Sequence, residues 1–169
     1  MLHKLKPRLT ALPAHDADAR LALQVSTFFG VGRLRPAPGT LGSLAAIPFG
    51  FLIASAGGPV ALALAALIVT YVGAKAATTY GKKSGTVDDQ SIVIDEVAGM
   101  WIAAIPAATI PALWVVAFLL FRFFDIYKPW PASYFDNKKR GGWDVMLDDV
   151  IAGLFALCGV AFLALQIPV

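Results

Sequence analysis

The sequence predicts an all-α protein, a multihelical bundle embedded in a membrane and built partly from helical hairpins. Its composition is apolar: 58 % of the 169 residues are hydrophobic, 15 % are charged, and the mean hydropathy is +0.71. Soluble domains average roughly 45–50 % apolar and about 25 % charged residues. The charges also avoid three long stretches, which are residues 36–74, 97–121 and 150–169. The competing interpretation is a very apolar soluble helical domain, and the length suits one domain in either case.

The first charge-free stretch is too long for one membrane crossing. A helix needs about 20 residues to cross roughly 30 Å of hydrocarbon, and residues 41–75 exceed that number. They are interrupted by Gly57-Gly58-Pro59, and glycine and proline both break helices. We therefore expect two helices, roughly 43–56 and 59–79, that form a hairpin.

The second stretch has the length of one crossing, but Pro106 and Pro111 interrupt residues 97–121. We expect a short or re-entrant hairpin that bends at Ile105–Pro111. Each arm is then too short to span the membrane and lies shallowly or inside the bundle. The third stretch, residues 149–167, fits a single crossing.

The basic residues predict the orientation. They fall in four clusters, at 4–35, 75–83, 122–128 and 138–140. The positive-inside preference places all four in the cytoplasm. The second stretch must then begin and end on the cytoplasmic side of the membrane, so the acids at its two ends come together. The sequence thus predicts a site on the cytoplasmic face, with the C-terminal helix ending at Val169 on the far side.

The N-terminal residues carry less information. We divide the chain into a poorly ordered or interfacial tail, residues 1–20, and one domain, residues 21–169. The basic tail lacks the adjoining apolar segment of a cleaved signal peptide, and Leu21–Phe29 is a short apolar stretch suited to the interface. The single cysteine, Cys158, cannot form an internal disulfide. Nothing indicates a nucleic-acid partner, and the oligomeric state is left open.

Acidic residues gather at the ends of the charge-free stretches. Asp95-Glu96 precede the second stretch, Asp125 follows it, and Asp148-Asp149 precede the third. Each pair is expected to open a helix rich in small residues, and Glu96 shares a helical face with Gly99, which allows a close neighbour. Helix capping explains one acid at such a position. Five carboxylates exceed that need and suit a hard cation such as Mg²⁺, which prefers several oxygen ligands.

Basic side chains accompany these acids. Lys128 lies three residues after Asp125, so both project to one side of a last helical turn, and Pro129 ends the helix. A lysine there is either an interfacial anchor that snorkels to the headgroups or a phosphate ligand beside the metal site. Arg122 is a second candidate for holding the phosphate.

A loop rich in glycine and proline, Arg33–Ser43, precedes the first hairpin. Thr40 or Ser43 is expected to cap the helix that follows, and the exposed backbone N–H groups of such a turn suit a phosphate. The loop is no Walker motif, because no Gly-Lys-Ser/Thr follows a strand.

Four segments in this order resemble the phosphatidylglycerophosphatase A family, from about residue 24 to the C-terminus. They are Pro38–Ser43, Ile92–Gly99, Phe121–Pro129 and Gly142–Gly153. The resemblance implies an all-helical fold, Mg²⁺ dependence and a cytoplasm-facing site in the bacterial inner membrane. It also implies a hydrolase that removes the terminal phosphate of phosphatidylglycerophosphate and so makes phosphatidylglycerol in glycerophospholipid biosynthesis. Because this chain departs from the family's usual residues just before the second acidic pair, no role is assigned to Asp144.

The resemblance and the residues point to the same side chains. The expected metal ligands are Asp95, Glu96, Asp148 and Asp149, the further catalytic residues are Asp125 and Lys128, and the expected substrate contacts are Thr40, Ser43, Arg122 and Lys128. A water is the expected nucleophile, with attack by a carboxylate as the alternative. Two other functions stay open: an Mg²⁺-dependent phosphatase of another membrane lipid phosphate, and a non-enzymatic cation-binding carrier subunit. Acids at the ends of the apolar segments, away from their middles, favour an enzyme at the membrane surface.

Overall fold

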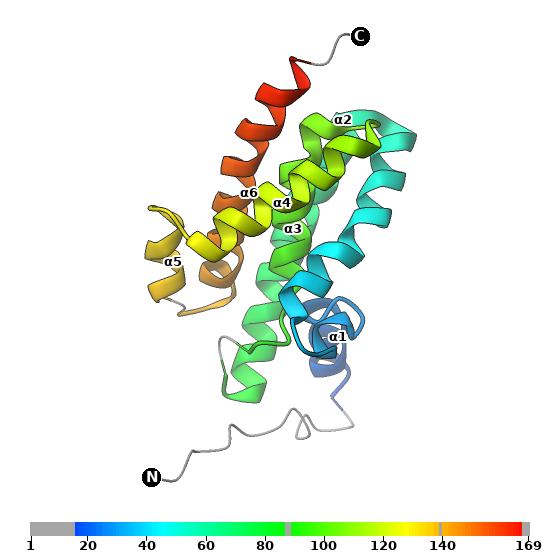
Figure 1. Ribbon diagram of the computed structural model, residues 1–169. Helices are drawn as coiled ribbons and strands as arrows, with labels where there is room; N and C mark the ends of the chain where they lie inside the picture. Colours follow the sequence, from blue (N-terminus) through cyan, green and yellow to red (C-terminus); the bar gives the residue numbers. More distant parts are fainter. Residues whose placement is uncertain (1–15, 87–88, 139, 167–169) are drawn as a thin grey trace.

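A computed structural model describes residues 16–86, 89–138 and 140–166. These residues form a bundle of α-helices with two short 3₁₀ turns and contain no strand (Figure 1), which confirms the all-α prediction. The elements are α1 (Ala17–Ser26), η1 (Val31–Arg33), α2 (Pro38–Ser84), α3 (Ile94–Ala104), η2 (Ile105–Ala107), α4 (Pro111–Tyr127), α5 (Ala132–Lys138) and α6 (Gly142–Ala164).

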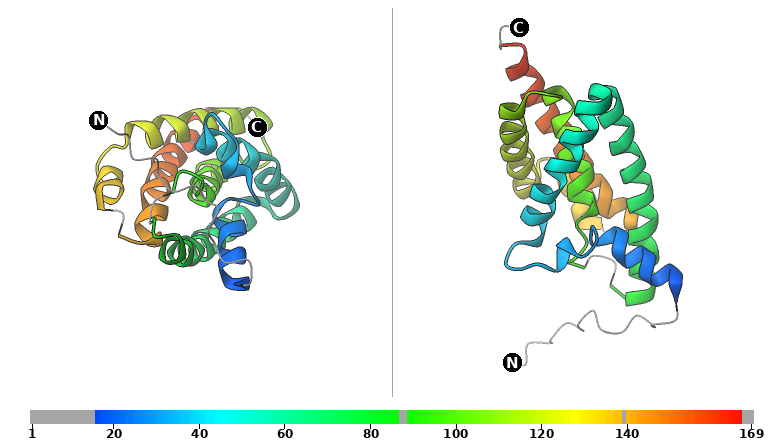
Figure 2. Two further views of the ribbon diagram at one scale, coloured as in Figure 1. Left: turned by 90° about the horizontal axis from the view of Figure 1, so that it is seen from below. Right: turned by 90° about the vertical axis from the view of Figure 1, so that its right-hand side faces the viewer.

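The predicted hairpin is present in α2, whose two arms run up the bundle and back again (Figures 1 and 2). The break is Gly58, with φ 69° and ψ −168°, a conformation open essentially to glycine alone. Both arms are longer than expected, because α2 begins at Pro38 and ends at Ser84. The longer first arm brings the start of α2 to the level of the acidic residues.

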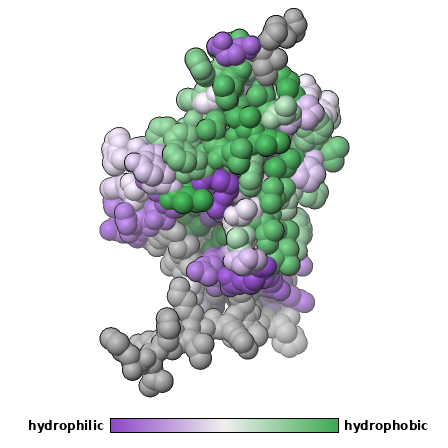
Figure 3. All heavy atoms as spheres, in the orientation of Figure 1, coloured by the Kyte–Doolittle hydropathy of each residue, from purple (hydrophilic) through white to green (hydrophobic). Residues whose placement is uncertain are grey.

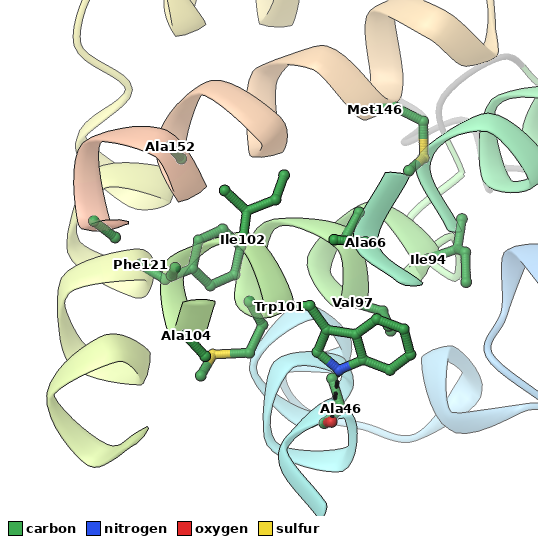
Figure 4. Close-up of a cluster of buried hydrophobic side chains, with 14 of the residues drawn as sticks. Ala46, Ala66, Ile94, Val97, Trp101, Ile102, Ala104, Phe121, Met146 and Ala152 are labelled. Atoms are coloured by element: carbon green, nitrogen blue, oxygen red, sulfur yellow. Dashed lines mark hydrogen bonds between the residues drawn. The ribbon is translucent and has the colours of Figure 1, made fainter. Parts of the chain in front are cut away.

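Helix α3 occupies the centre of the bundle, as the view from below shows (Figure 2, left). Every residue of α3 except Asp95 is buried. Buried polar groups need partners, and Trp101 has one: its indole N–H donates to the carbonyl of Ala46 in α2 at 2.9 Å (Figure 4). The central position of α3 lets Asp95 and Glu96, in its first turn, face the neighbouring helices.

Two glycines set the distance between α3 and α6. A Cβ on Gly153 would lie 2.6 Å from the carbonyl oxygen of Gly99, and a Cβ on Gly99 would lie 2.7 Å from the carbonyl oxygen of Asp149. The backbones can approach this closely only because neither residue has a side chain. Since Glu96 lies one turn before Gly99, and Asp149 one turn before Gly153, this contact brings the two carboxylates together.

The predicted second hairpin is also present. Helix α3 ends at Ala104, the chain turns through η2, and α4 returns toward the end where α3 began (Figure 1). The arms have 11 and 17 residues, or about 16 and 25 Å at 1.5 Å per residue. Neither reaches the roughly 30 Å of a full crossing, so this hairpin depends on its neighbours for burial.

Two helices, α2 and α6, are long and apolar enough to cross a membrane. Only 17 % of the most apolar window of α2 is buried, whereas the core helix of a soluble protein is mostly covered. The apolar side chains form a continuous surface over the upper part of the molecule (Figure 3). This favours the membrane-embedded bundle over the soluble helical domain.

The start of α6 differs from the prediction. Asp148 and Asp149 do not open this helix; they lie about two turns into it, because α6 begins at Gly142. The predicted division of the chain at residues 20 and 21 falls inside α1, and residues 1–15 of the expected tail lie outside the described residues. That division stays a prediction. The short helix α5 was not predicted at all.

Candidate active site

A cavity of about 420 Å³ opens at the end of the bundle where α2 and α3 begin. Its walls come from the segment before α2 and the first turn of α2, from α3, α4 and α6, and from the residues leading into α3. The lining residues are Arg35, Pro36, Ala37, Pro38, Gly39, Thr40, Asp89, Gln90, Ile92, Asp95, Glu96, Arg122, Asp125, Lys128 and Asp149. Polar and charged side chains dominate this lining in a protein whose surface is otherwise largely apolar.

Three carboxylates from three helices converge in this cavity. One oxygen from each of Glu96 in α3, Asp125 in α4 and Asp149 in α6 lies within 4.8 Å of the other two. All three side chains are largely buried, and Asp149 Oδ2 has no hydrogen-bond partner among the described residues. Buried carboxylates repel one another unless a cation lies between them. The donor set is all oxygen, which suits Mg²⁺, so the residues present fit a divalent metal.

Two of the expected metal ligands, Asp95 and Asp148, lie outside this group of three carboxylates. Asp95 lines the cavity, but its Oδ1 accepts the backbone N–H of Glu96 at 3.0 Å. Asp148 accepts from Lys128, with Nζ and Oδ2 2.7 Å apart, and its other oxygen accepts the N–H of Asp149. The structure therefore brings Asp125, expected as either a metal ligand or an orienting residue, into the group of three carboxylates, and it places Asp95 and Asp148 beside that group.

Arg122 contacts two members of the cluster formed by Glu96, Asp125 and Asp149. Its Nη1 forms ion pairs with Glu96 and with Asp125, the latter at 2.8 Å. Its Nε is buried and has no hydrogen-bond partner among the described residues. Guanidinium groups favour such multiple carboxylate contacts because they present several donors in one plane. Arg122 thus offsets part of the negative charge of the cluster.

Lys128 links the cluster to α5. It ends α4 with a left-handed backbone (φ 47°), and its Nζ lies 3.1 Å from Asp136 and 3.8 Å from Asp125, in addition to the contact with Asp148. Burial lowers the pKa of Lys128, but attraction to Asp148 outweighs it, and the net pKa lies above the usual value for lysine. The predicted side-by-side placement of Lys128 and Asp125 is confirmed.

Residues in the first two turns of α2 contact Glu96. Ser43 Oγ lies 2.9 Å from Glu96 Oε2 and 3.0 Å from the carbonyl of Gly39. A Cβ on Gly39 would lie 2.1 Å from Glu96 Oε1, so a larger residue at this position would displace the Glu96 carboxylate. Ser43 is fully buried and does not line the cavity, which places it behind Glu96; its expected contact with the substrate stays a prediction.

The capping prediction for this segment is wrong. Helix α2 begins at Pro38 after Ala37, without a side-chain cap, so Thr40 and Ser43 both lie inside the helix. The helix begins earlier because proline is well suited to a first turn. Thr40 does line the cavity, and the N–H groups in the first turn of a helix lack intrahelical partners and favour anions.

Sequence reasoning missed other members of the site. Asp136 contacts Lys128, and Arg35 donates to the Gln90 side chain at 3.3 Å on the cavity wall. The only signal for Asp136 was its place among the basic residues that follow Lys128. Asp144, to which no role was assigned, accepts the backbone N–H of Arg140 and does not line the cavity.

Comparisons with known proteins bear on this site. The sequence model of the family described as phosphatidylglycerophosphatase A matches residues 24–164. The chain belongs to the phosphatidylglycerophosphatase A family. The match includes every carboxylate of the central group, together with Arg122, Lys128 and both glycines of the α3–α6 contact.

Individual relatives agree with the family. The chain is 38 % identical to phosphatidylglycerophosphatase A of Escherichia coli over 88 % of its own length and 90 % of the relative's. It is 40 % identical to the Haemophilus influenzae protein of the same name, over 76 % of this chain and 80 % of that relative. A Bacteroides thetaiotaomicron protein named putative phosphatidylinositol-3-phosphatase is 36 % identical over 83 % of this chain and 92 % of that relative. No solved structure gives a significant match.

Proposed function

We propose that this chain hydrolyses phosphatidylglycerophosphate to phosphatidylglycerol and inorganic phosphate, a step of glycerophospholipid biosynthesis. It would be a phosphoric monoester hydrolase. The observation that carries the proposal is that two relatives named phosphatidylglycerophosphatase A, 38 and 40 % identical, align over most of the chain. The convergence of Glu96, Asp125 and Asp149 in a polar cavity supports it chemically.

The metal in this proposal is Mg²⁺, held by Glu96, Asp125 and Asp149, with Asp95 and Asp148 in supporting positions. Bound there, Mg²⁺ would offset charge on the phosphate oxygens as the P–O bond breaks. Arg122 would keep Glu96 and Asp125 oriented. Lys128 would move between its carboxylates and the phosphate, which is a dianion near neutral pH, with a second pKa of about 6. The N–H groups at the start of α2, near Thr40, would bind the same phosphate.

Water is the proposed nucleophile. No cysteine or histidine lines the cavity among the described residues, and Cys158 is exposed on α6. His3 and His15 lie outside the described residues. Attack by one of the carboxylates is the alternative, and a phosphorylated protein trapped by acid quench during turnover would favour it over water.

The proposed location is the bacterial inner membrane with the cavity facing the cytoplasm. The support is the exposed apolar surface of α2 and α6 and the gathering of charged residues around the cavity end (Figure 3). A cysteine at Gly58, in the turn between the arms of α2, should react with an impermeant reagent from outside or be protected. A cysteine at Lys82 should react only after the inner face is opened. Labelling of position 82 from outside would contradict this orientation.

The decisive assay offers purified protein three lipid phosphates in mixed micelles, with EDTA or with Mg²⁺: phosphatidylglycerophosphate, phosphatidate and an isoprenyl phosphate. We expect Mg²⁺-dependent phosphate release that is fastest with phosphatidylglycerophosphate. Asp149→Asn should abolish it. Asp144→Asn, in the same helix but outside the cavity, is the matched control and should not. Equal rates on all three lipids would refute the proposed substrate.

A second candidate is hydrolysis of another lipid phosphate. It is favoured by the relative named putative phosphatidylinositol-3-phosphatase, which is 36 % identical to this chain. Adding phosphatidylinositol 3-phosphate to the panel tests it directly. A higher kcat/KM on that lipid would replace the first proposal.

A further inference from the structure

A second cavity, of about 280 Å³, lies between α1 and η1. Its lining residues are Arg20, Leu23, Gln24, Thr27, Phe29, Gly30 and Arg33. None of them lines the candidate active site. The lining contains two arginines and no acid, so the two cavities are opposite in charge.

The two arginines are available to a ligand. Arg20 and Arg33 are exposed at the surface, and neither forms an ion pair with a carboxylate among the described residues. Two acids lie near Arg20. Asp16, the N-cap of α1, pairs with Lys83 and accepts the N–H of Ala19, and Asp18, in the first turn of α1, forms no ion pair among the described residues. Two guanidinium groups that line one cavity and have no ion-pair partner among the described residues suit an anion, and guanidinium matches the geometry of phosphate.

An apolar side chain stands at the mouth of the same cavity. Phe29 is 79 % exposed. Phe28 and Phe29 both have left-handed backbones, with φ 45° and 55°, a conformation that such residues rarely adopt. The bonds that hold this turn include Phe29 N–H to the carbonyl of Gln24, at 2.7 Å, and Gly30 N–H to the Thr27 hydroxyl, at 3.0 Å. The turn directs Phe28 inward and leaves Phe29 outside.

The position of α1 fits a membrane interface. This helix lies crosswise to the spanning helices at the lower edge of the apolar surface (Figures 2 and 3). Phe28 packs edge-on against Phe49 of α2, which belongs to that surface, with ring centroids 5.6 Å apart. Leu21 and Leu34 add exposed apolar side chains. Aromatic and basic residues side by side are typical of the level at which lipid headgroups lie.

We propose that this cavity binds one anionic phospholipid of the surrounding membrane. Its phosphodiester would lie between Arg20 and Arg33, and Phe29 would pack against the upper part of the acyl chains. Thr27, which also lines the cavity, is buried, and the proposed lipid would enter from the bilayer. The site is separate from the catalytic cavity, and the bound lipid would not be hydrolysed.

The test uses phosphatidylglycerol as the probe and places a reporter at the cavity. Phe29→Trp in the full chain, in nonionic detergent with EDTA, is titrated with phosphatidylglycerol, phosphatidylcholine or glycerol 3-phosphate. The tryptophan signal is taken as the difference from the parent protein, which has four tryptophans of its own. We expect a saturable blue shift with phosphatidylglycerol, at least about tenfold weaker binding of phosphatidylcholine, and no shift with glycerol 3-phosphate.

Charge variants complete the test. Arg20→Gln with Arg33→Gln on the same background should weaken phosphatidylglycerol binding at least about tenfold. The matched control removes two other cations, Lys75 and Lys138, which lie over tyrosine rings and line neither cavity, and should leave binding unchanged. Unaltered binding in the arginine variant, or equal affinity for phosphatidylcholine, would overturn the proposal. Because the probe is a diester and no metal is present, the outcome does not depend on the proposed hydrolysis.

Discussion

The contact between Gly99 and Gly153 offers the sharpest test of how the site is assembled. Gly153→Ala adds one methyl group to the face of α6 that touches α3. The new Cβ would lie 2.6 Å from the carbonyl oxygen of Gly99, whereas ordinary contact begins at 3.4 Å. The atom that it meets is backbone and cannot rotate away, so the helices must separate by up to the difference, 0.8 Å.

That displacement is large for the proposed Mg²⁺ site. Asp149 lies one turn from Gly153 and Glu96 one turn from Gly99, so the separation acts almost directly on the two carboxylates. Mg²⁺ requires near-octahedral geometry with oxygens at about 2.0–2.1 Å, and misplacing a catalytic group by about 1 Å costs on the order of a hundredfold in rate. We expect kcat to fall about a hundredfold, and stability to fall by about 1–3 kcal/mol from overpacking.

The matched control is Gly159→Ala, two turns further along α6. It adds the same methyl group with the same gain in helix propensity, about 1 kcal/mol. Its Cβ would meet only the side chain of Leu120, at 2.8 Å, which can rotate away. Mg²⁺-dependent kcat and melting temperature in detergent are measured for both variants. Full kcat in Gly153→Ala, or an equal loss in Gly159→Ala, would refute the reasoning.

Three further predictions concern single residues. Lys128→Ala should lower kcat/KM at least about tenfold, equivalent to about 1.4 kcal/mol, while the protein stays folded in detergent. An unchanged kcat/KM would show that the lysine only anchors the structure. Ser43→Ala removes a hydrogen bond to a charged group, worth about 1.5–3 kcal/mol. It should raise the Mg²⁺ concentration needed for half-maximal rate, and restoration by Ser43→Thr would separate this role from packing. Gly58→Ala forces alanine into a region reserved for glycine and should cost about 1–3 kcal/mol of stability, with kcat of the folded fraction unchanged; an unaltered melting curve would contradict it.

The helical hairpins could be predicted because their signals are local. Gly58 and the two prolines Pro106 and Pro111 interrupt charge-free stretches, and in the structure the chain turns at those places. The start of α6 carries no such signal. Its N-cap is Gly141, without a capping side chain, so the first strong helix-start signal in the sequence is the acidic pair at 148 and 149, about two turns too late.

The composition of the central cluster could not be predicted in the same way. The sequence indicated that five carboxylates would gather at one end of the bundle. Which three converge depends on the crossing of α3 and α6 at Gly99 and Gly153, a contact between residues more than fifty positions apart. Similarly, Ser43 has the side chain of a typical cap, and only the position of α3 beside α2 shows that it binds Glu96.

The central position of α3 also bears on the biogenesis of the protein. This helix has 11 residues, all but one of them covered by neighbours, so it is too short to be retained in a bilayer by its own hydrophobicity. One of its covering helices, α6, is synthesised after it, and α6 supplies Asp149. Glu96 and Asp125 are therefore synthesised before Asp149, and the group of three carboxylates is complete only once α6 has been made. A chain that ends before α6 would lack Asp149 and would therefore hold only two of the three converging carboxylates. It would also leave uncovered the face of α3 at Gly99 that packs on Gly153.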